Sequence, residues 1–181
     1  MDETAYGHGL RESTAEIKVL ENRLVTIKVQ FNLIDYLNSE AGSKSPIDLE
    51  MISVMPEGMF ESVYASVTES FLSGMQVFCK RLDGSAQRIH INARFPSAQQ
   101  AKGLIKRERV EKQYSGNGKP PYTYSDRRFF QVFNFEFRLA KSDSIDCLRM
   151  RFPSQLADVF TSFSEQQTRH VAPMSEWSKE R

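Results

Sequence analysis

The amino-acid sequence predicts an α+β domain with a mostly antiparallel sheet, built from three β-hairpins and accompanied by about three helices. Two observations predict this class. Apolar and polar residues alternate over several stretches, which is the period of a strand with one buried face. In another stretch, apolar residues recur at intervals of three and four, which is the period of an amphipathic helix. The chain of 181 residues is long enough for one domain with a sizeable core.

The first hairpin is predicted in residues 16–34. Its second strand carries apolar residues at alternate positions from Val25 to Leu33, with mostly polar residues between them. Glu21-Asn22 supplies the turn, and a segment with the composition of a loop follows the strand. Ser45-Pro46 then predicts the start of a short helix.

The clearest helix is predicted to begin at Pro56 and to end at Ser73-Gly74. Its apolar residues share one face over about four turns. They are Phe60, Val63, Tyr64, Val67 and Phe71. One continuous apolar face indicates a helix that packs against a core.

A second hairpin and a further helix follow. Asp83-Gly84 is a strong tight-turn pair, and apolar residues alternate on the returning strand from Ile89 to Phe95. Ser97 and Gln100 have the spacing of a capping box. The sequence therefore predicts a hairpin that leads directly into a helix.

The third hairpin, predicted in the stretch from Arg128 to Phe152, has the strongest alternation in the chain. One face of its first strand carries Phe129, Gln131, Phe133, Phe135, Phe137 and Leu139. The polar run from Lys141 to Ser144 supplies the turn. A helix is predicted to follow Ser154, on the spacing of Leu156, Val159, Phe160 and Phe163.

Two short sequence motifs each occur twice along the chain, in the same order. Gln-Val-Phe occurs at 76–78 and 131–133, and Arg-Phe-Pro-Ser ends each returning strand, with Arg94 matching Arg151. These motifs predict a repeated hairpin–helix unit. Its two copies are predicted at residues 76–113 and 131–168. The alternative is that antiparallel α+β domains commonly reuse hairpins and Pro-Ser helix starts.

The predicted domain spans residues 15–168, between mobile tails at 1–14 and 169–181. No apolar run reaches the roughly 18 residues that a membrane helix needs, and the polar N-terminus is not a signal peptide. Cys79 and Cys147 both fall in predicted strands and are interpreted as buried free thiols in a reducing compartment. We therefore expect a cytoplasmic, intracellular protein with no membrane partner.

Phe130 and Val132 lie opposite the main apolar face of the third hairpin. The strand is thus apolar on both sides at its start. Because a strand buried on both faces needs cover, this pattern predicts a homodimer.

Catalytic and metal-binding motifs are absent from the sequence. The histidines His8, His90 and His170 have no His, Cys or Asp partner at a metal-ligand spacing. The glycine-containing segment 115–119 lacks the spacing of a phosphate-binding loop, and two prolines follow it. We expect a protein that is not an enzyme, without cofactor or metal. A competing hypothesis is an enzyme whose site assembles around His90.

Acidic and basic residues are concentrated in different parts of the chain. Residues 1–75 hold five Lys or Arg against twelve Asp or Glu, whereas residues 76–130 hold twelve against four. Such segregation favours a basic surface patch that recruits polyanions, and the competing interpretation is self-association of the acidic half with the basic half. The candidate nucleic-acid-binding residues are the cations and tyrosines of a predicted helix and the loop after it. They are Lys102, Lys106, Arg107, Arg109, Lys112, Tyr114, Lys119, Tyr122, Tyr124, Arg127 and Arg128.

The candidate helix and loop have the residue types that single strands require. Lys102, Lys106 and Arg109 share one helix face by their spacing, and tyrosines offer flat surfaces for unpaired bases. Leu104 and Val110 are expected to face the core instead. These features predict an accessory or regulatory protein that binds single-stranded DNA or RNA. The alternative is a protein-binding adaptor or inhibitor that docks on an acidic partner with the same patch or with Trp177.

Overall fold

The computed structural model describes residues 13–41, 46–80, 84–114, 130–141, 143, 148–156 and 158–165. These residues form eight strands in two mostly antiparallel sheets and four α-helices, which confirms the α+β class. The strands are β1 (Ser13–Val19), β2 (Leu24–Phe31), β3 (Gln76–Lys80), β4 (Ala86–Ile89), β5 (Asn92–Arg94), β6 (Gln131–Arg138), β7 (Leu148–Arg151) and β8 (Val159–Glu165). The helices are α1 (Leu33–Ala41), α2 (Leu49–Val54), α3 (Glu57–Gly74) and α4 (Ala98–Tyr114), with a short 3-10 helix, η3 (Ser154–Leu156).

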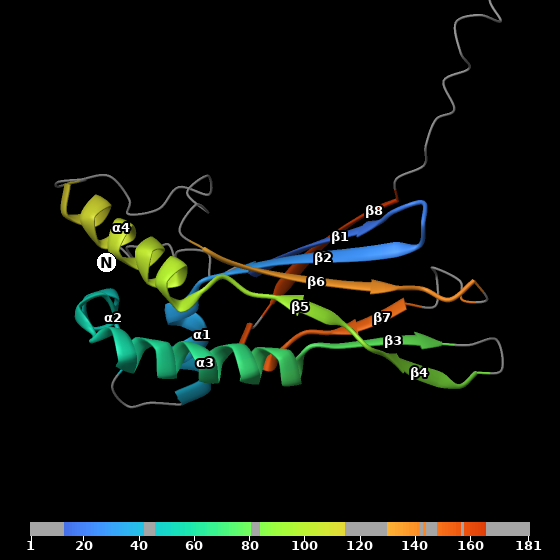
Figure 1. Ribbon diagram of the computed structural model, residues 1–181, viewed down its shortest axis with the longest axis horizontal. Coiled ribbons are helices and arrows are strands. Elements are labelled where there is room, and N and C mark those ends of the chain that lie inside the picture. The colour runs from blue at the N-terminus through green and yellow to red at the C-terminus, as the bar shows by residue number, and fades with distance from the viewer. Residues whose placement is uncertain are drawn as a thin grey trace, which may run out of the picture.

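The larger sheet has five strands in the order β5-β6-β2-β1-β8. All of its neighbouring strands are antiparallel except β8, which pairs parallel with β1. The smaller sheet has three antiparallel strands in the order β4-β3-β7. Figure 1 shows the larger sheet as the upper layer, with α1 and α3 below one half of it and the smaller sheet below the other half.

An aromatic cluster joins the inner face of the larger sheet to α3. The ring of Phe71 on α3 lies 5.0 Å from that of Phe31 on β2, centroid to centroid. It lies 4.8 Å from the ring of Phe133 and 5.9 Å from that of Phe135, both on β6. All four side chains are buried. Because buried aromatic rings contribute a large apolar area each, this cluster is the centre of the core.

Two of the predicted hairpins are present. β1 and β2 are joined by a turn at Glu21-Asn22, as expected. β3 and β4 pair as the second hairpin, and Gly84 in its connection has a φ of 83°, which glycine adopts without steric cost. The returning strand is not continuous, however. It divides on either side of the exposed His90 into β4, in the smaller sheet, and β5, in the larger one.

The third predicted hairpin does not form, because its two strands belong to different sheets. β6 pairs with β2 and β5, whereas β7 pairs with β3. Alternation along β6 is as strong as predicted, with Phe133, Phe135 and Phe137 all buried. Alternation alone shows which face of a strand is buried, and it leaves the choice of neighbouring strand open.

The predicted helix after Ser154 is wrong, and the predicted repeat is not shown by the structure. Only the three-residue η3 follows Pro153, and the chain then enters β8. Val159 and Phe160, whose spacing suggested a helix, are successive residues of β8. They pair with Ser13 and Thr14 of β1. Backbone pairing with an available strand edge therefore overrides the helical spacing. Among the described residues of 76–113 and 131–168, only the first range contains a long helix.

Helix α1 was not expected from the sequence. Asn32 caps it, because its side-chain oxygen accepts hydrogen bonds from the backbone N–H groups of Ile34 at 2.9 Å and Asp35 at 3.4 Å. Leu33, interpreted as the end of a strand, is the first residue of the helix. The capping residue after Phe31 was the signal for this change of structure.

Cys79 is disulfide-bonded, and the structure describes no free cysteine. The prediction of two free thiols is therefore wrong. The only other cysteine in the sequence, Cys147, lies outside the described residues. Because disulfides are rare in cytosolic proteins, the argument for a reducing compartment loses its basis.

Candidate nucleic-acid interface

Lys102, the first predicted binding residue, is buried rather than displayed. Only 6% of the residue is exposed. Its ammonium group donates a hydrogen bond to the backbone carbonyl of Met55 and lies 5.7 Å from the ring centroid of Phe60. The charge is thus satisfied by a carbonyl dipole and an aromatic face. Lys102 attaches α4 to the connection between α2 and α3, and it does not share an exposed face with Lys106.

Of the other α4 cations whose side chains are described, Arg109 is paired with a carboxylate, and Lys106 and Arg107 are exposed. Arg109 forms an ion pair with Glu50 of α2, with 2.5 Å between Nη2 and Oε1. Val110, predicted to face the core, is 48% exposed, while Ile105 is buried. Ala101 is buried too, so the expectation fails for Val110, which points away from the core.

The other predicted binding residues lie beyond what the structure describes. Lys112 and Tyr114 belong to the last turn of α4, but their side chains are outside the described part. Five loop residues and the C-terminal aromatic lie outside the described residues altogether. They are Lys119, Tyr122, Tyr124, Arg127, Arg128 and Trp177.

The outer face of the larger sheet carries three rows of side chains that run across the strands. The strand register places Ser162, Glu16, Lys28, Asn134 and Arg94 in the central row, in that order. One flanking row holds Phe160, Thr14, Gln30 and Val132. The other holds Ser164, Lys18, Thr26, Glu136 and Asn92. None of these side chains is buried, so this face is open across the described residues.

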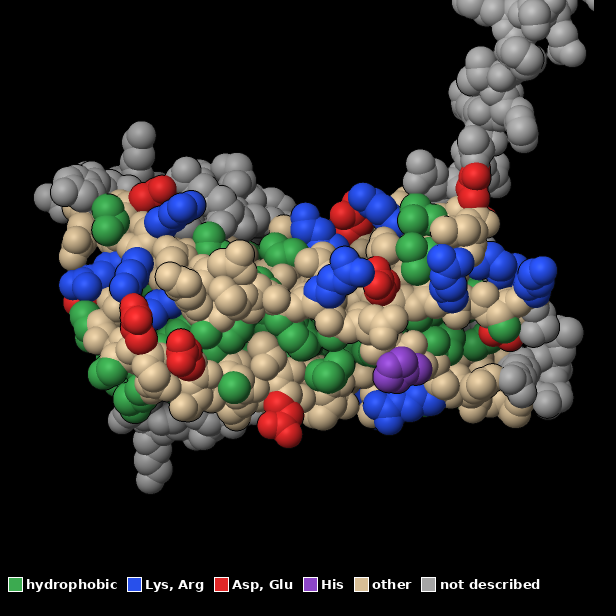
Figure 2. Space-filling model, viewed as in Figure 1, with side chains coloured by type: hydrophobic (Ala, Val, Ile, Leu, Met, Phe, Trp, Pro, Cys, Tyr) green, Lys and Arg blue, Asp and Glu red, His purple; other side chains and the backbone are tan. Residues whose placement is uncertain are grey.

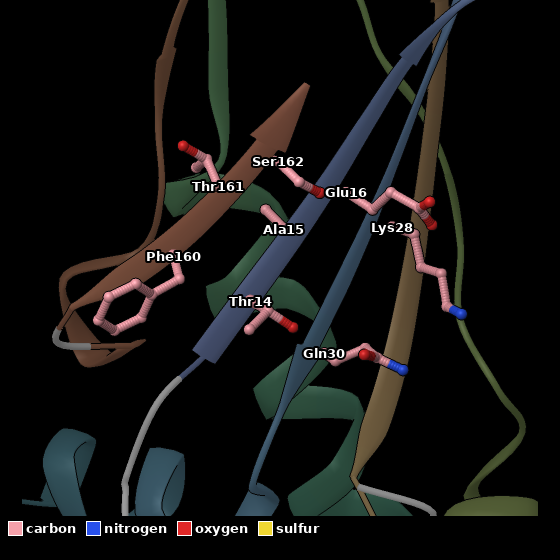
Figure 3. A pocket seen from close by; sticks show the side chains of 8 residues that line it. All are labelled: Thr14, Ala15, Glu16, Lys28, Gln30, Phe160, Thr161 and Ser162. Carbon is pink, nitrogen blue, oxygen red and sulfur yellow. The ribbon is translucent and has the colours of Figure 1, made fainter. Parts of the chain in front are cut away.

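Three hollows follow one another across this face from β8 to α4, and we call them the sheet track. The first, of about 350 Å³, is lined by residues of β8, β1 and β2 (Figure 3). The second, also of about 350 Å³, lies over β1, β2, β6 and β5. The third, of about 600 Å³, lies between β5, β6 and α4. Lys28 lines both the first and the second hollow, and Arg94 lines both the second and the third, so neighbouring hollows adjoin.

Cations outnumber carboxylates along the sheet track. Its lining contains the cations Lys18, Lys28, Arg94 and Arg107 and the carboxylates Glu16 and Glu136. Figure 2 shows Lys and Arg side chains, with fewer Asp and Glu, along the side of the molecule formed by the larger sheet and α4. A net positive surface of this kind attracts anionic ligands over a distance of about one Debye length.

Two ion pairs reduce the charge of the track in part. Lys18 and Glu16 are 2.8 Å apart, and the hydrogen bond from Lys18 lowers the pKa of the Glu16 carboxyl group. Arg94 pairs with Glu136 at 2.9 Å, yet 74% of the Arg94 side chain is exposed. Lys28 and Arg107 form no ion pair with any described residue. These two residues are therefore the cations most available to a ligand.

The described part of the chain contains no candidate metal-binding group and no candidate membrane-spanning helix. No group of His, Cys, Asp or Glu side chains there has the arrangement of a metal site. No helix there is both long enough and apolar enough to cross a membrane.

No protein-family model matches the sequence, and no curated protein or solved structure matches it either. The chemistry of the sheet track is thus the basis for a functional proposal.

Sequence reasoning pointed to α4 and missed the sheet track. A signal was present, because Lys28 and Asn134 each stand at polar positions of an alternating strand, opposite its main apolar face. That they are neighbours depends on the pairing of β2 with β6. The pairing of strands so far apart in the sequence cannot be predicted from local sequence patterns.

Proposed function

We propose that the protein is a non-enzymatic accessory or regulatory protein that binds single-stranded nucleic acid along its sheet track. The observation that carries the proposal is the succession of Lys28, Arg94 and Arg107 along adjoining hollows on one face of the described chain. A phosphate backbone has the matching property, which is a regular series of negative charges. Cations bind these charges without regard to base sequence.

The third hollow is suited to hold one nucleotide by several contacts. Arg94 and Arg107 both line it, beside the amide side chains of Gln100 and Asn134. Guanidinium groups donate pairs of hydrogen bonds to phosphate oxygens, and amides can both donate to and accept from base edges. Its volume of about 600 Å³ is in the range of small-molecule binding clefts.

An unpaired strand fits this surface better than a duplex. Protein sheets that bind nucleic acid commonly do so with splayed, unpaired bases laid over their outer faces. The neutral polar side chains of the track, among them Thr14, Gln30 and Asn134, can hydrogen-bond to exposed base edges.

The experiment is fluorescence anisotropy with a labelled oligothymidylate of about 16 nucleotides, titrated at several salt concentrations. The logarithm of the affinity should fall linearly with the logarithm of the salt concentration, with a slope of about −0.7 for each phosphate contacted. Lys28→Gln and Arg107→Gln should each flatten the slope by about 0.7 and weaken binding to all sequences alike. The control is Arg88→Gln, which removes an exposed cation from β4 of the smaller sheet and should leave the slope unchanged.

Two results would contradict the proposal. One is the absence of binding to DNA and RNA at low salt. The other is an equal effect of Arg88→Gln, which would show that the track is not the binding surface. In the first case the adaptor hypothesis leads, because an acidic protein partner would use the same cations without any contact to bases.

A further inference from the structure

One aromatic side chain of β8 stands exposed on the sheet track. Phe160 is 54% exposed and lines the first hollow. It lies in the same cross-strand row as Thr14 and Gln30. Figure 3 shows Thr14 between Phe160 and Gln30. The hollow thus has an apolar ring at one end and an amide group at the other.

These groups match the two kinds of surface that a nucleobase offers. The face of a base stacks on an aromatic ring, and its edge carries hydrogen-bond donors and acceptors. The amide of Gln30 has both an acceptor and donors, and the hydroxyl of Thr14 can act as either. Lys28 lies in the adjacent row and also lines the hollow, so a cation is available to the phosphate of the same nucleotide.

We propose that the first hollow is a subsite for one unpaired base, with Phe160 as its stacking platform. This inference rests on the proposed function and adds a contact that depends on bases rather than on phosphates. Every base has a flat face, and the amide can adapt to different edges. The subsite should therefore accept any of the bases with little preference.

The chain supplies a matched control on the same strand. Phe163 is 55% exposed, which is nearly the same fraction as for Phe160. Successive side chains of a strand point to opposite faces, so Phe163, three positions later, lies on the face opposite the track. Phe160→Ala and Phe163→Ala thus remove the same group from the same strand at equal exposure. They differ in whether the ring faces the track.

The test measures binding of both variants to the labelled oligothymidylate and to an abasic chain of equal length. Phe160→Ala should weaken binding to the oligothymidylate by roughly 5- to 150-fold, the range for loss of one stacked base, and leave the salt slope unchanged. Phe163→Ala should bind as the wild type does. On the abasic chain, Phe160→Ala and the wild type should bind equally, because no base is there to stack.

The outcomes separate the subsite from the wider proposal. Wild-type binding with the expected salt dependence, together with an unchanged affinity of Phe160→Ala, would refute the subsite and leave the nucleic-acid function standing. An equal loss in Phe163→Ala would also refute it, since the effect would not depend on the track. If the wild type binds no nucleic acid, both proposals fail. Far-UV circular dichroism of the two variants confirms that each is folded.

Discussion

Replacing Phe133 with alanine tests how the larger sheet packs on its helices. The Phe133 side chain is fully buried at 0% exposure. Its ring centroid lies 4.8 Å from those of Phe31 and Phe71 and 4.5 Å from that of Phe95. The ring therefore connects β6 with β2, with α3 and with the segment that leads into α4.

The expected cost of Phe133→Ala follows from these contacts. Truncation of a buried phenylalanine destabilises a protein by about 3–5 kcal/mol, through lost transfer free energy and the cavity that remains. Each favourable ring pair adds about 0.5–1.5 kcal/mol beyond buried area. Because three rings lie close to Phe133, we expect a loss in the upper half of the range, about 4–5 kcal/mol. This is a large part of the roughly 5–15 kcal/mol that stabilises a typical domain.

Urea denaturation followed by circular dichroism measures this loss as a lower transition midpoint with an unchanged m-value. Phe163→Ala is the control, because its ring is 55% exposed and its removal should change the free energy of unfolding by less than about 0.5 kcal/mol. A loss below about 1.5 kcal/mol for Phe133→Ala would contradict the aromatic core described above, as the cavity of a buried phenylalanine costs more.

Four further predictions concern single contacts and assembly. Ser97→Ala should cost about 0.5–2 kcal/mol in urea denaturation, because the Ser97 hydroxyl and the Gln100 side chain cap each other's backbone N–H groups at 3.2 and 2.8 Å. Lys18→Met should raise the pKa of Glu16 in an NMR titration. That pKa is lowered in the folded state, so the stabilisation by Glu16 is present above its unfolded pKa and is lost as the pH falls through the folded value. Thiol titration of the unreduced, denatured protein should find no free thiol at Cys79, and a reductant should lower the urea midpoint. Sedimentation velocity at micromolar concentration checks the predicted homodimer, for which a species of monomer mass would be the contrary result.

The fold was predictable where the signal is local. Alternation along β2 and β6 and the apolar face of α3 identified these elements, since each face follows from residues within a few positions. Strand order was not predictable in this way. β6 and β7 are close in sequence, yet they pair with β2 and β3, and β8 pairs with the edge of β1. Such pairings depend on contacts between distant residues.

The residues of the candidate site were likewise predictable only where the signal is local. Lys106 was expected on the shared face of the helix, one turn after Lys102, and it is exposed. Lys102 has the same spacing pattern, but it is buried against Met55 and Phe60, because α4 docks on the connection between α2 and α3. Lys28 and Asn134 could be assigned to solvent-facing positions, although not to one surface. Composition thus identified cations, and tertiary packing decided which of them a ligand can reach.

NMR observation of side-chain amides tests the central claim most directly. Gln30 lines the first hollow of the sheet track and Asn134 lines the second and third, whereas Gln87 is exposed on β4 of the smaller sheet. On addition of oligothymidylate, the amide signals of Gln30 and Asn134 should shift with saturation, and those of Gln87 should not move. A titration in which Gln87 shifts while Gln30 and Asn134 stay in place, or in which none of the three moves, would contradict nucleic-acid binding on the sheet track.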